Sequence, residues 1–383
     1  MSNVPANPTQ KRILIMAGGT GGHIFPAIAV AEKLKATGWD IHWLGTADRM
    51  EAQIVPAHGF KLHFVKVTGL RGRGIFAKIQ SLIALFKAII EAFKLIKELK
   101  PSVVLGMGGY ASGPGGIAAR LVGKPLLIHE QNVVLGLTNR WLAKFANVVM
   151  LGFDSARKQL PNNNNVVVTG NPVRKKIMTL TTSESVASIS TLNILVVGGS
   201  LGAGPFNQHL PAILGQLNNV NVLHQCGKSN TAEVNAAYHQ HVKSLDSDTQ
   251  SKIEVTEFID DMSHAYQWAD IVICRAGAIT VTEVALAGVA AIFIPLPHAV
   301  DDHQTANANS LVERRAAYLV RQADLPNKLI DLLSDIIAKP EQLKTVRLNA
   351  LDCAISTGAD KVAELCEKYG KNDMRSSPKG VAV

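Results

Sequence analysis

Short apolar runs alternate with longer stretches of helix-like periodicity along almost the whole chain. The apolar runs predict buried strands, which we expect in the first half at residues 13–16, 41–44, 103–105, 126–128, 148–150 and 166–168. In the second half we expect them at residues 194–197, 220–224, 271–274 and 291–294. Strands that alternate with helices in this way are typical of parallel, doubly wound α/β sheets.

The two halves of the chain also resemble each other. The sequence LIMAGGT at 14–20 matches ILVVGGS at 194–200, and a second glycine-rich or alanine-rich turn follows in each half, at 106–110 and 274–278. Two similar units in tandem predict two Rossmann-like domains that face each other across a cleft. The carboxyl ends of the strands are then expected to point into that cleft.

Composition indicates where the domains begin and end. We expect an N-terminal domain over 1–175, a linker over 176–191 that is rich in Ser and Thr, and a C-terminal domain over 192–350. A helix over 351–371 is expected to return toward the N-terminal domain, and the polar residues 372–383 are expected to form a frayed tail.

The excess positive charge lies in the N-terminal half. Residues 1–173 carry 20 Lys and Arg against 8 Asp and Glu, whereas residues 174–383 carry 19 against 22. This asymmetry indicates that the N-terminal domain meets an anionic surface or substrate. Nucleic acid is not favoured, because the basic residues are not interleaved with aromatic ones and no nucleic-acid-binding motif is found. The four cysteines have no metal-binding spacing and are expected to be reduced thiols.

The segment 70–100 differs from the rest, because it combines seven Lys and Arg and two acids with many apolar residues. One interpretation is an apolar patch rimmed by cations that docks on an anionic membrane leaflet. The other is an ordinary packing helix with solvated lysines. No uncharged apolar stretch approaches the ~20 residues that a membrane span needs. The first ten residues lack the apolar core of a secretory signal.

The sequence AGGTGGHIFP at 17–26 directly follows the first expected strand. Its glycines let backbone N–H groups approach a ligand, and the next helix favours an anionic one. A dinucleotide site is not favoured, because the third glycine of that fingerprint falls on Ile24 and no acid ends the second strand. No Walker lysine follows. Asp246 and Asp248 have the spacing of a metal-binding pair, but they lie in a polar stretch that is typical of a solvated loop.

The second half offers turns suited to a nucleotide diphosphate. The sequence GGSLG at 198–202 places N–H groups and a hydroxyl at a helix N-terminus, and GAITVTE at 277–283 forms a second such turn. Glu283 lies one helical turn inside, where a carboxylate can accept two hydrogen bonds from a ribose diol. A solvated helix acid is the alternative. The polar residues 301–307 follow a buried strand and are well placed for sugar hydroxyls.

Several of these segments match one family in order and spacing. They are residues 18–26, 106–114 (GMGGYASGP), 129–132 (HEQN), 170–174 (GNPVR), 198–200, 257–262 (EFIDDM) and the turn that ends at Glu283. Through them, from about residue 12 to 365, the chain resembles the N-acetylglucosaminyltransferases of peptidoglycan synthesis in glycosyltransferase family 28. The resemblance implies a GT-B fold and no metal or other cofactor.

The resemblance also implies an activity and a place in the cell. These enzymes move GlcNAc from UDP-GlcNAc to the C4 hydroxyl of undecaprenyl-diphosphate-linked MurNAc-pentapeptide, which converts lipid I to lipid II. They act as peripheral proteins at the cytoplasmic face of the inner membrane. The implied partners are both substrates, the anionic membrane surface through Leu70–Lys100, and other proteins of cell-wall synthesis and division.

The site residues carried over from the family fall in both expected domains. The implied UDP-GlcNAc contacts are Thr20, Gly21, Gly22, Asn132 and Arg174, followed by Ser200, Ile259, Ala278, Ile279, Thr280, Val281, Thr282, Glu283 and Gln304. Among these, Ile259 would lie beside the uracil and Glu283 would bind the ribose. A catalytic role is also expected for Glu283, together with His23.

The implied reaction inverts configuration at the sugar, so the attacking hydroxyl needs a base. His23 is the leading candidate, because the ordinary pKa of an imidazole, ~6.5, suits proton transfer near neutrality. A role for His23 in orienting the acceptor or contacting the diphosphate stays open. His129 and Glu130 are weaker candidates for the base.

Two other function classes stay open at this level. Another two-domain UDP-sugar enzyme, such as a UDP-GlcNAc 2-epimerase or a glycolipid transferase, would share the nucleotide turns. A non-catalytic peripheral membrane protein would bind the nucleotide without turnover. The cationic apolar segment favours a lipid acceptor, and His23 and Glu283 in turns expected to face each other argue against a protein that only binds.

Overall fold

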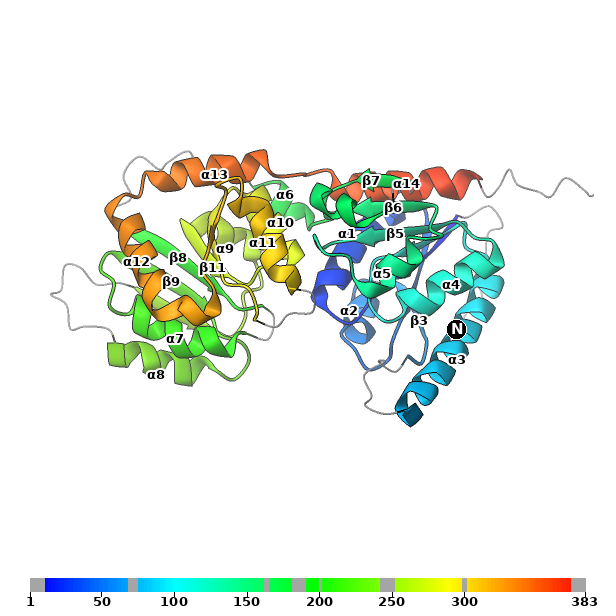
Figure 1. Cartoon of the computed structure of the whole chain (residues 1–383), viewed down its shortest axis with the longest axis horizontal. Coiled ribbons are helices and arrows are strands. Elements are labelled where there is room, and N and C mark those ends of the chain that lie inside the picture. The colour runs from blue at the N-terminus through cyan, green and yellow to red at the C-terminus, as the bar shows by residue number, and fades with distance from the viewer. Residues whose placement is uncertain are drawn as a thin grey trace, which may run out of the picture. The chain divides into compact units, whose positions relative to one another are not determined.

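The computed structural model describes residues 11–67, 75–161, 165–180, 191–199, 202–241, 252–297 and 302–372. The chain divides into two compact units, Met1–Arg174 with Ser356–Val383, and Lys175–Ile355 (Figure 1). The division at 174/175 falls one residue before the expected end of the N-terminal domain, and the segment from Ser356 belongs to the first unit. Most of the expected linker, 181–190, lies outside the described residues.

The first unit is built on a parallel sheet of seven strands in the order β3-β2-β1-β4-β5-β6-β7. The strands are β1 (Arg12–Met16), β2 (Asp40–Gly45), β3 (Lys61–Phe64), β4 (Val103–Gly106), β5 (Leu126–Glu130), β6 (Val148–Leu151) and β7 (Val166–Val168). The chain places β2 on one side of β1 and β4 on the other. Such a reversal of strand order opens a ligand site at the carboxyl ends of the two central strands.

Helices cover both faces of this sheet. Neighbouring residues of a strand point to opposite faces, and because residues 13–16 of β1 are apolar, both faces have to be buried. Ile13 and Ile15 pack with α1 (Gly21–Ala36) and α14 (Gly358–Asn372), whereas Leu14 and Met16 pack with α3 (Ile75–Leu99), α4 (Ser112–Val122) and α5 (Leu137–Leu142) (Figure 1). The short α2 (Glu51–Ala57) and a 3-10 helix (Asp154–Gln159) complete the unit.

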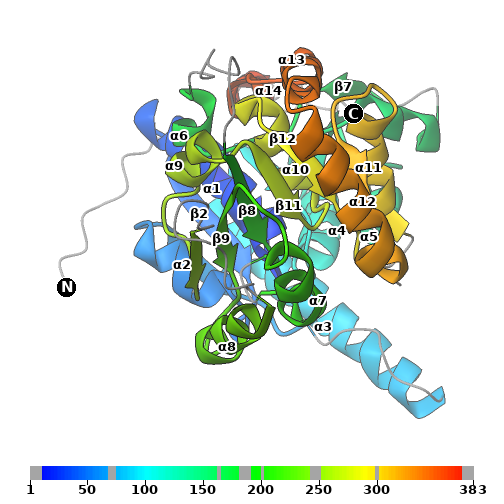
Figure 2. The same ribbon diagram turned by 90° about the vertical axis from the view of Figure 1, so that its left-hand side faces the viewer.

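The second unit repeats this plan with six parallel strands in the order β10-β9-β8-β11-β12-β13. The strands are β8 (Leu192–Val197), β9 (Val220–Gln225), β10 (Ile253–Thr256), β11 (Ile271–Cys274), β12 (Ala290–Phe293) and β13 (Tyr318–Leu319). The helices are α6 (Lys175–Met178), α7 (Gly204–Leu214), α8 (Thr231–His241), α9 (Met262–Trp268), α10 (Ala278–Ala287), α11 (His303–Val312), α12 (Leu325–Ala338) and α13 (Gln342–Asp352). Figure 2 shows α7 and α8 side by side, and both pack on the sheet face that α12 also covers.

The doubly wound α/β class expected from the sequence is confirmed in both units. The C-terminal helix begins later than expected: α13 ends at Asp352, and α14 starts only at Gly358. Gly358 is required there, because a Cβ would lie 2.4 Å from the carbonyl oxygen of Asn171. Within the described residues, no helix is both long and apolar enough to span a bilayer.

Candidate active site

In the first unit, β1 and β4 each run into a glycine turn at the carboxyl edge of the sheet. The two turns touch, since a Cβ at Gly109 would lie 2.4 Å from the carbonyl oxygen of Gly18. Gly19 and Gly109 both have φ of +88°, a conformation that strains any residue with a Cβ. The loop predicted from its glycines is therefore a close-packed pair of turns at the switch point of the sheet.

His23 lies in the first turn of α1 and is half-buried against the second glycine turn. A Cβ at Gly108 would lie 2.6 Å from His23 Cδ2. His23 Nδ1 lies 3.2 Å from the carbonyl oxygen of Gly18. Because a carbonyl can only accept, this hydrogen bond requires the proton on Nδ1 and leaves the lone pair of the neutral ring on Nε2. That tautomer suits a general base.

Thr20, Gly21 and Gly22 form the N-terminus of α1. Thr20 is exposed, and its extended backbone lets its carbonyl accept from the N–H groups of His23 at 3.1 Å and Ile24 at 3.2 Å. Gly22 is exposed and Gly21 half-buried, so the backbone is accessible where the helix dipole is positive.

Arg174 reaches the same turn from the end of the unit. Its guanidinium lies 5.9 Å from the centroid of the Phe25 ring. Phe25 in turn packs on Gly21, where a Cβ would lie 2.9 Å from Phe25 Cε2. Asn132 follows β5, and both its N–H and its side-chain amide donate to Glu130 Oε1, at 3.0 and 3.2 Å. Arg174 is thus brought to the loop of Thr20–Gly22, and Asn132 is held at the end of a neighbouring strand.

His129 and Glu130 are structural in this unit. Burial lowers the pKa of His129 to about 4, and its Nε2–H donates to the carbonyl oxygen of Gly170 at 3.1 Å. Glu130 is buried and also accepts from the Gly136 N–H at 3.0 Å and from Asn139 Nδ2 at 2.8 Å. Both side chains hold backbone and neighbouring side chains in place, which argues against either as the base.

Glu51 was not expected from the sequence. No acid ends β2, but Glu51 at the start of α2 folds back beneath the loop, and its Oε2 accepts from the Gly19 N–H at 3.0 Å. One signal in the sequence could have indicated it: β2 ends at Gly45 without an acidic residue, and Glu51 follows six residues later.

In the second unit, the turn behind β8 begins with Gly198 and Gly199, and Ser200 lies outside the described residues. Gln225 at the end of β9 organises this turn and was also not expected. Its Nε2 donates to the carbonyl oxygen of Gly199 at 2.8 Å, and its Oε1 accepts from the Ile259 N–H at 3.4 Å. One buried amide therefore brings the turn and Ile259 together, while the Ile259 side chain stays half-buried.

The turn at 278–282 presents only some of its side chains. Ile279 and Thr280 are half-buried and accessible, whereas Ala278, Val281 and Thr282 are buried. The N–H of Val281 donates to the Gly277 carbonyl oxygen at 2.9 Å, and the Thr282 hydroxyl donates to that of Ala278, also at 2.9 Å. The inner residues fix α10 to the sheet, and Ile279 and Thr280 face outward at its N-terminus.

Glu283 is 6% exposed, which excludes the alternative of a solvated helix acid. The hydroxyl of Tyr266, from α9, donates to its Oε2 at 3.3 Å. A carboxylate accepts several hydrogen bonds, so this contact leaves further acceptor capacity. Gln304, in the first turn of α11, accepts from the Leu296 N–H at 2.9 Å through Oε1. The amide group of Gln304 is thereby oriented as a donor.

Two family descriptions match this chain: the glycosyltransferase family 28 N-terminal domain over residues 13–151 and the family 28 C-terminal domain over residues 193–365. The chain belongs to glycosyltransferase family 28. A family 28 relative from Tolumonas auensis, named as the UDP-N-acetylglucosamine–N-acetylmuramyl-(pentapeptide) pyrophosphoryl-undecaprenol N-acetylglucosamine transferase, is 49% identical over 93% of this chain and 99% of its own. A relative of the same name from Shewanella sp. (strain ANA-3) is 46% identical over 93% and 97%.

Solved structures agree with this assignment. The crystal structure of Acinetobacter baumannii MurG superimposes with a TM-score of 0.80 at 40% identity, covering 94% of this chain and 99% of the other. The fold of the family 28 protein is therefore GT-B, with two parallel α/β domains. A UDP-N-acetylglucosamine 2-epimerase structure aligns with a TM-score of 0.63 at 16% identity, which shows a shared fold alone.

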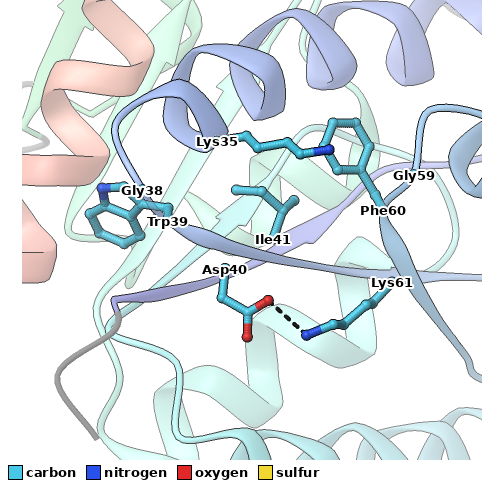
Figure 3. A pocket seen from close by; sticks show the side chains of 8 residues that line it. All are labelled: Lys35, Gly38, Trp39, Asp40, Ile41, Gly59, Phe60 and Lys61. Atoms are coloured by element: carbon cyan, nitrogen blue, oxygen red, sulfur yellow. Dashed lines mark hydrogen bonds and ion pairs between the residues drawn. The ribbon is translucent and has the colours of Figure 1, made fainter. Parts of the chain in front are cut away.

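A cavity of about 280 Å³ lies away from these turns, where β2 and β3 begin (Figure 3). Its floor holds Asp40, whose Oδ1 accepts from Lys61 Nζ at 2.9 Å, and Lys35 lies over Phe60. The lining residues are Lys35, Gly38, Trp39, Asp40, Ile41, Gly59, Phe60 and Lys61. Because ligands of parallel α/β sheets bind at the carboxyl ends of strands, this cavity is not the candidate active site.

The described residues contain no group of three His, Cys, Asp or Glu side chains arranged to hold a metal ion. The pair Asp246 and Asp248 lies outside the described residues.

Proposed function

We propose that this family 28 glycosyltransferase moves GlcNAc from UDP-GlcNAc to the C4 hydroxyl of the MurNAc-pentapeptide on undecaprenyl diphosphate, which converts lipid I to lipid II. The observation that carries this proposal is the 49% identity, over nearly the full length of both chains, to a transferase named for that reaction. The site residues of both units fit the chemistry, as follows.

The second unit holds the donor. The Glu283 carboxylate, oriented by Tyr266, accepts hydrogen bonds from the ribose diol, and the half-buried Ile259 packs beside the uracil. The N-terminus of α10, at Ile279 and Thr280, favours the diphosphate. Ser200 and the amide of Gln304 complete the proposed donor contacts. Thr20, Gly21, Gly22, Asn132 and Arg174 of the first unit contribute the remaining contacts to the donor.

His23 is the general base. As O4 of MurNAc attacks the anomeric carbon, the new O4–C1 bond forms while the bond from C1 to the diphosphate oxygen breaks, and UDP leaves with the electron pair. The O4 proton passes to His23 Nε2, the nitrogen that the Gly18 hydrogen bond leaves with a lone pair. One displacement inverts the α-linked donor to a β-1,4 product. Backbone N–H groups at the helix N-termini stabilise the charge on UDP.

The outward face of α3 docks on the anionic inner leaflet, which places the protein at the cytoplasmic face of the membrane that carries its acceptor. Four large apolar side chains on this face, Leu82, Ile83, Phe86 and Ile90, are 51–58% exposed. On the opposite face of the helix Ala88 is fully buried, and Ala92 and Ile96 pack in the core. Exposed lysines, Lys87, Lys94 and Lys97, accompany the apolar face, a combination typical of interfacial helices.

UDP release by the purified protein tests the proposed reaction. With UDP-GlcNAc and a lipid I analogue, without added divalent metal, we expect UDP to appear only when the acceptor is present. Conversion of UDP-GlcNAc alone to its 2-epimer would identify an epimerase instead. Binding of UDP without release in the presence of acceptor would refute the transferase.

A vesicle assay tests the docking face separately. Changing Phe86 to Ser should weaken sedimentation with vesicles that contain anionic phospholipid, since it removes apolar area from the exposed face, while the affinity for UDP-GlcNAc stays unchanged. Changing Leu348 to Ser, an exposed apolar residue of the second unit, is the matched control. Equal sedimentation of both variants and the wild type would exclude this face.

A further inference from the structure

Glu51 is buried directly beneath the loop that carries His23, with 1% of its surface exposed. Its Oε2 accepts from the Gly19 N–H at 3.0 Å. Its Oε1 accepts from the N–H of Thr46 at 3.0 Å and from the Thr46 hydroxyl at 2.7 Å. As the first residue of α2, it also lies where the helix dipole favours a carboxylate. These hydrogen bonds and the helix dipole stabilise the charge of a buried carboxylate.

The peptide group between Gly18 and Gly19 joins this carboxylate to His23. Its N–H is the Gly19 group that donates to Glu51, and its carbonyl oxygen is the Gly18 atom 3.2 Å from His23 Nδ1. Carboxylate, peptide and imidazole therefore form one chain of hydrogen bonds. Hydrogen bonds in series polarise one another, so a carboxylate that draws on the N–H makes the carbonyl oxygen a better acceptor for Nδ1–H.

Packing fixes both ends of this chain. A Cβ at Gly18 would lie 2.4 Å from Glu51 Oε1, and a Cβ at Gly45 would lie 2.7 Å from Glu51 Cγ, so the Glu51 side chain packs closely on two glycines. The His23 ring is held from its other side by Gly108, where a Cβ would lie 2.6 Å from Cδ2. The geometry of the chain thus depends on close packing as well as on hydrogen bonds.

We propose that Glu51 is a positioning residue for His23, which holds the imidazole in its Nδ1–H tautomer and stabilises its protonated form through the Gly18–Gly19 peptide. This rests on the proposed role of His23 as the base. A carboxylate bonded directly to a catalytic histidine acts in the same way, and here one peptide group is inserted between them.

Charged side chains on neighbouring elements also bear on the stability of the protonated His23. Arg49, whose guanidinium lies 5.5 Å from the centroid of the Tyr110 ring, adjoins the second glycine turn, and Arg174 lies over Phe25 of α1. Cations disfavour an imidazolium, whereas the Glu51 carboxylate favours it. The effect of Glu51 on the protonated His23 is therefore opposite in sign to that of any nearby cation.

The Glu51→Gln variant tests the proposal, because it keeps the shape of the side chain and removes its charge. We expect kcat to fall by about 10-fold, by analogy with the loss of a partner that orients a metal-bound histidine, with the KM for UDP-GlcNAc unchanged. The acidic limb of the kcat/KM profile should move to lower pH, because the imidazolium is less stabilised. Thr46→Val is the matched control: it removes a hydrogen bond to the same carboxylate but keeps the charge and the Gly19 contact. It should lower the thermal midpoint and leave the pH profile unchanged.

Nitrogen NMR of histidine-labelled protein, with His23 assigned by comparison with His23→Ala, tests the chain without turnover. The wild type should show the Nδ1–H tautomer, and His23 in Glu51→Gln should titrate at lower pH. An Nε2–H tautomer in the wild type would overturn the proposal even if Glu51→Gln does not fold. So would a folded Glu51→Gln protein whose titration and pH profile match the wild type. If the NMR result is as proposed but no GlcNAc is transferred, Glu51 keeps this role and the proposed function fails.

Discussion

Gly19 and Gly199 occupy the same place in the two units, directly after the first strand of each. Each forms a hydrogen bond with a buried side chain from a neighbouring element. In the first unit that side chain is a carboxylate, Glu51, which accepts from the Gly19 N–H. In the second it is a neutral amide, Gln225, which donates to the Gly199 carbonyl oxygen. A repeated backbone plan is therefore fixed by a charge in one unit and by an uncharged group in the other.

The residues that follow the two loops also differ in whether they can carry a charge. At the offset that aligns the two glycine loops, His23 corresponds to Ala203. The unit with the buried carboxylate has the titratable ring, and the unit with the amide has none at that position. This matches the roles that we propose, in which the first unit supplies the base and some contacts to the donor, and the second unit holds the nucleoside of the donor through Glu283 and Ile259. The predictions below test that division, from the largest expected effect to the smallest.

Removing the imidazole should have the largest effect. For His23→Ala we expect kcat to fall by about 10²- to 10⁴-fold, the range for general base catalysis, because nothing else in the loop takes its place in the proposed mechanism. The affinity for UDP-GlcNAc, measured by calorimetry, should stay close to the wild type. His58→Ala, at the end of α2, is the control. Turnover near normal in His23→Ala would end its assignment as the base.

Removing the ribose contact should affect binding instead. For Glu283→Gln we expect the KM for UDP-GlcNAc to rise by about 10- to 100-fold, since a hydrogen bond to a charged group contributes ~1.5–3 kcal/mol, with a smaller change in kcat. Tyr266→Phe removes only the hydroxyl that orients Glu283 and should raise KM less. A loss of kcat at unchanged KM would contradict a role in donor binding.

Each unit also contains a fully buried histidine, His129 in the first and His224 in the second, that should make it sensitive to acid. Burial lowers the pKa of His129 and of His224 to about 4. The unfolded chain therefore binds more protons between pH 6.5 and 4, so stability is full above that window and falls as the pH decreases through it. From pH 7 to 5 each histidine should cost about 2 kcal/mol in the free energy of unfolding. Urea unfolding at pH 7 and pH 5 measures this decrease in the free energy of unfolding. The decrease should be smaller in His224→Gln, and an equal decrease in that variant would contradict the role of His224.

The smallest effect is expected from alanine at the two equivalent glycines. Gly19 and Gly199 have φ of +88° and +97°, and a Cβ at either would meet nothing within 4 Å. Gly19→Ala and Gly199→Ala should therefore each cost only backbone strain, about 1–2 kcal/mol. Steady-state kinetics should separate them: Gly19→Ala lowers kcat, and Gly199→Ala raises the KM for UDP-GlcNAc. The same kinetic change in both would remove the distinction between the units.

The sequence predicted the central strands well because their side chains are buried on both faces and form continuous apolar runs. It did not predict β3, β10 and β13, which lie at sheet edges and have half-exposed, mixed sequences such as KLHF at 61–64. The glycine loops were found from their composition. The side chains that hold them were not, because Glu51 and Gln225 reach the loops only through the fold.

The rate of GlcNAc transfer to lipid I at saturating UDP-GlcNAc, compared between His23→Ala and Glu283→Gln, tests the division of roles most directly. Radiolabel in the lipid product measures it. The account predicts that excess donor restores most of the transfer rate in Glu283→Gln and none of it in His23→Ala. Restoration of His23→Ala by donor, with Glu283→Gln still slow, would contradict it.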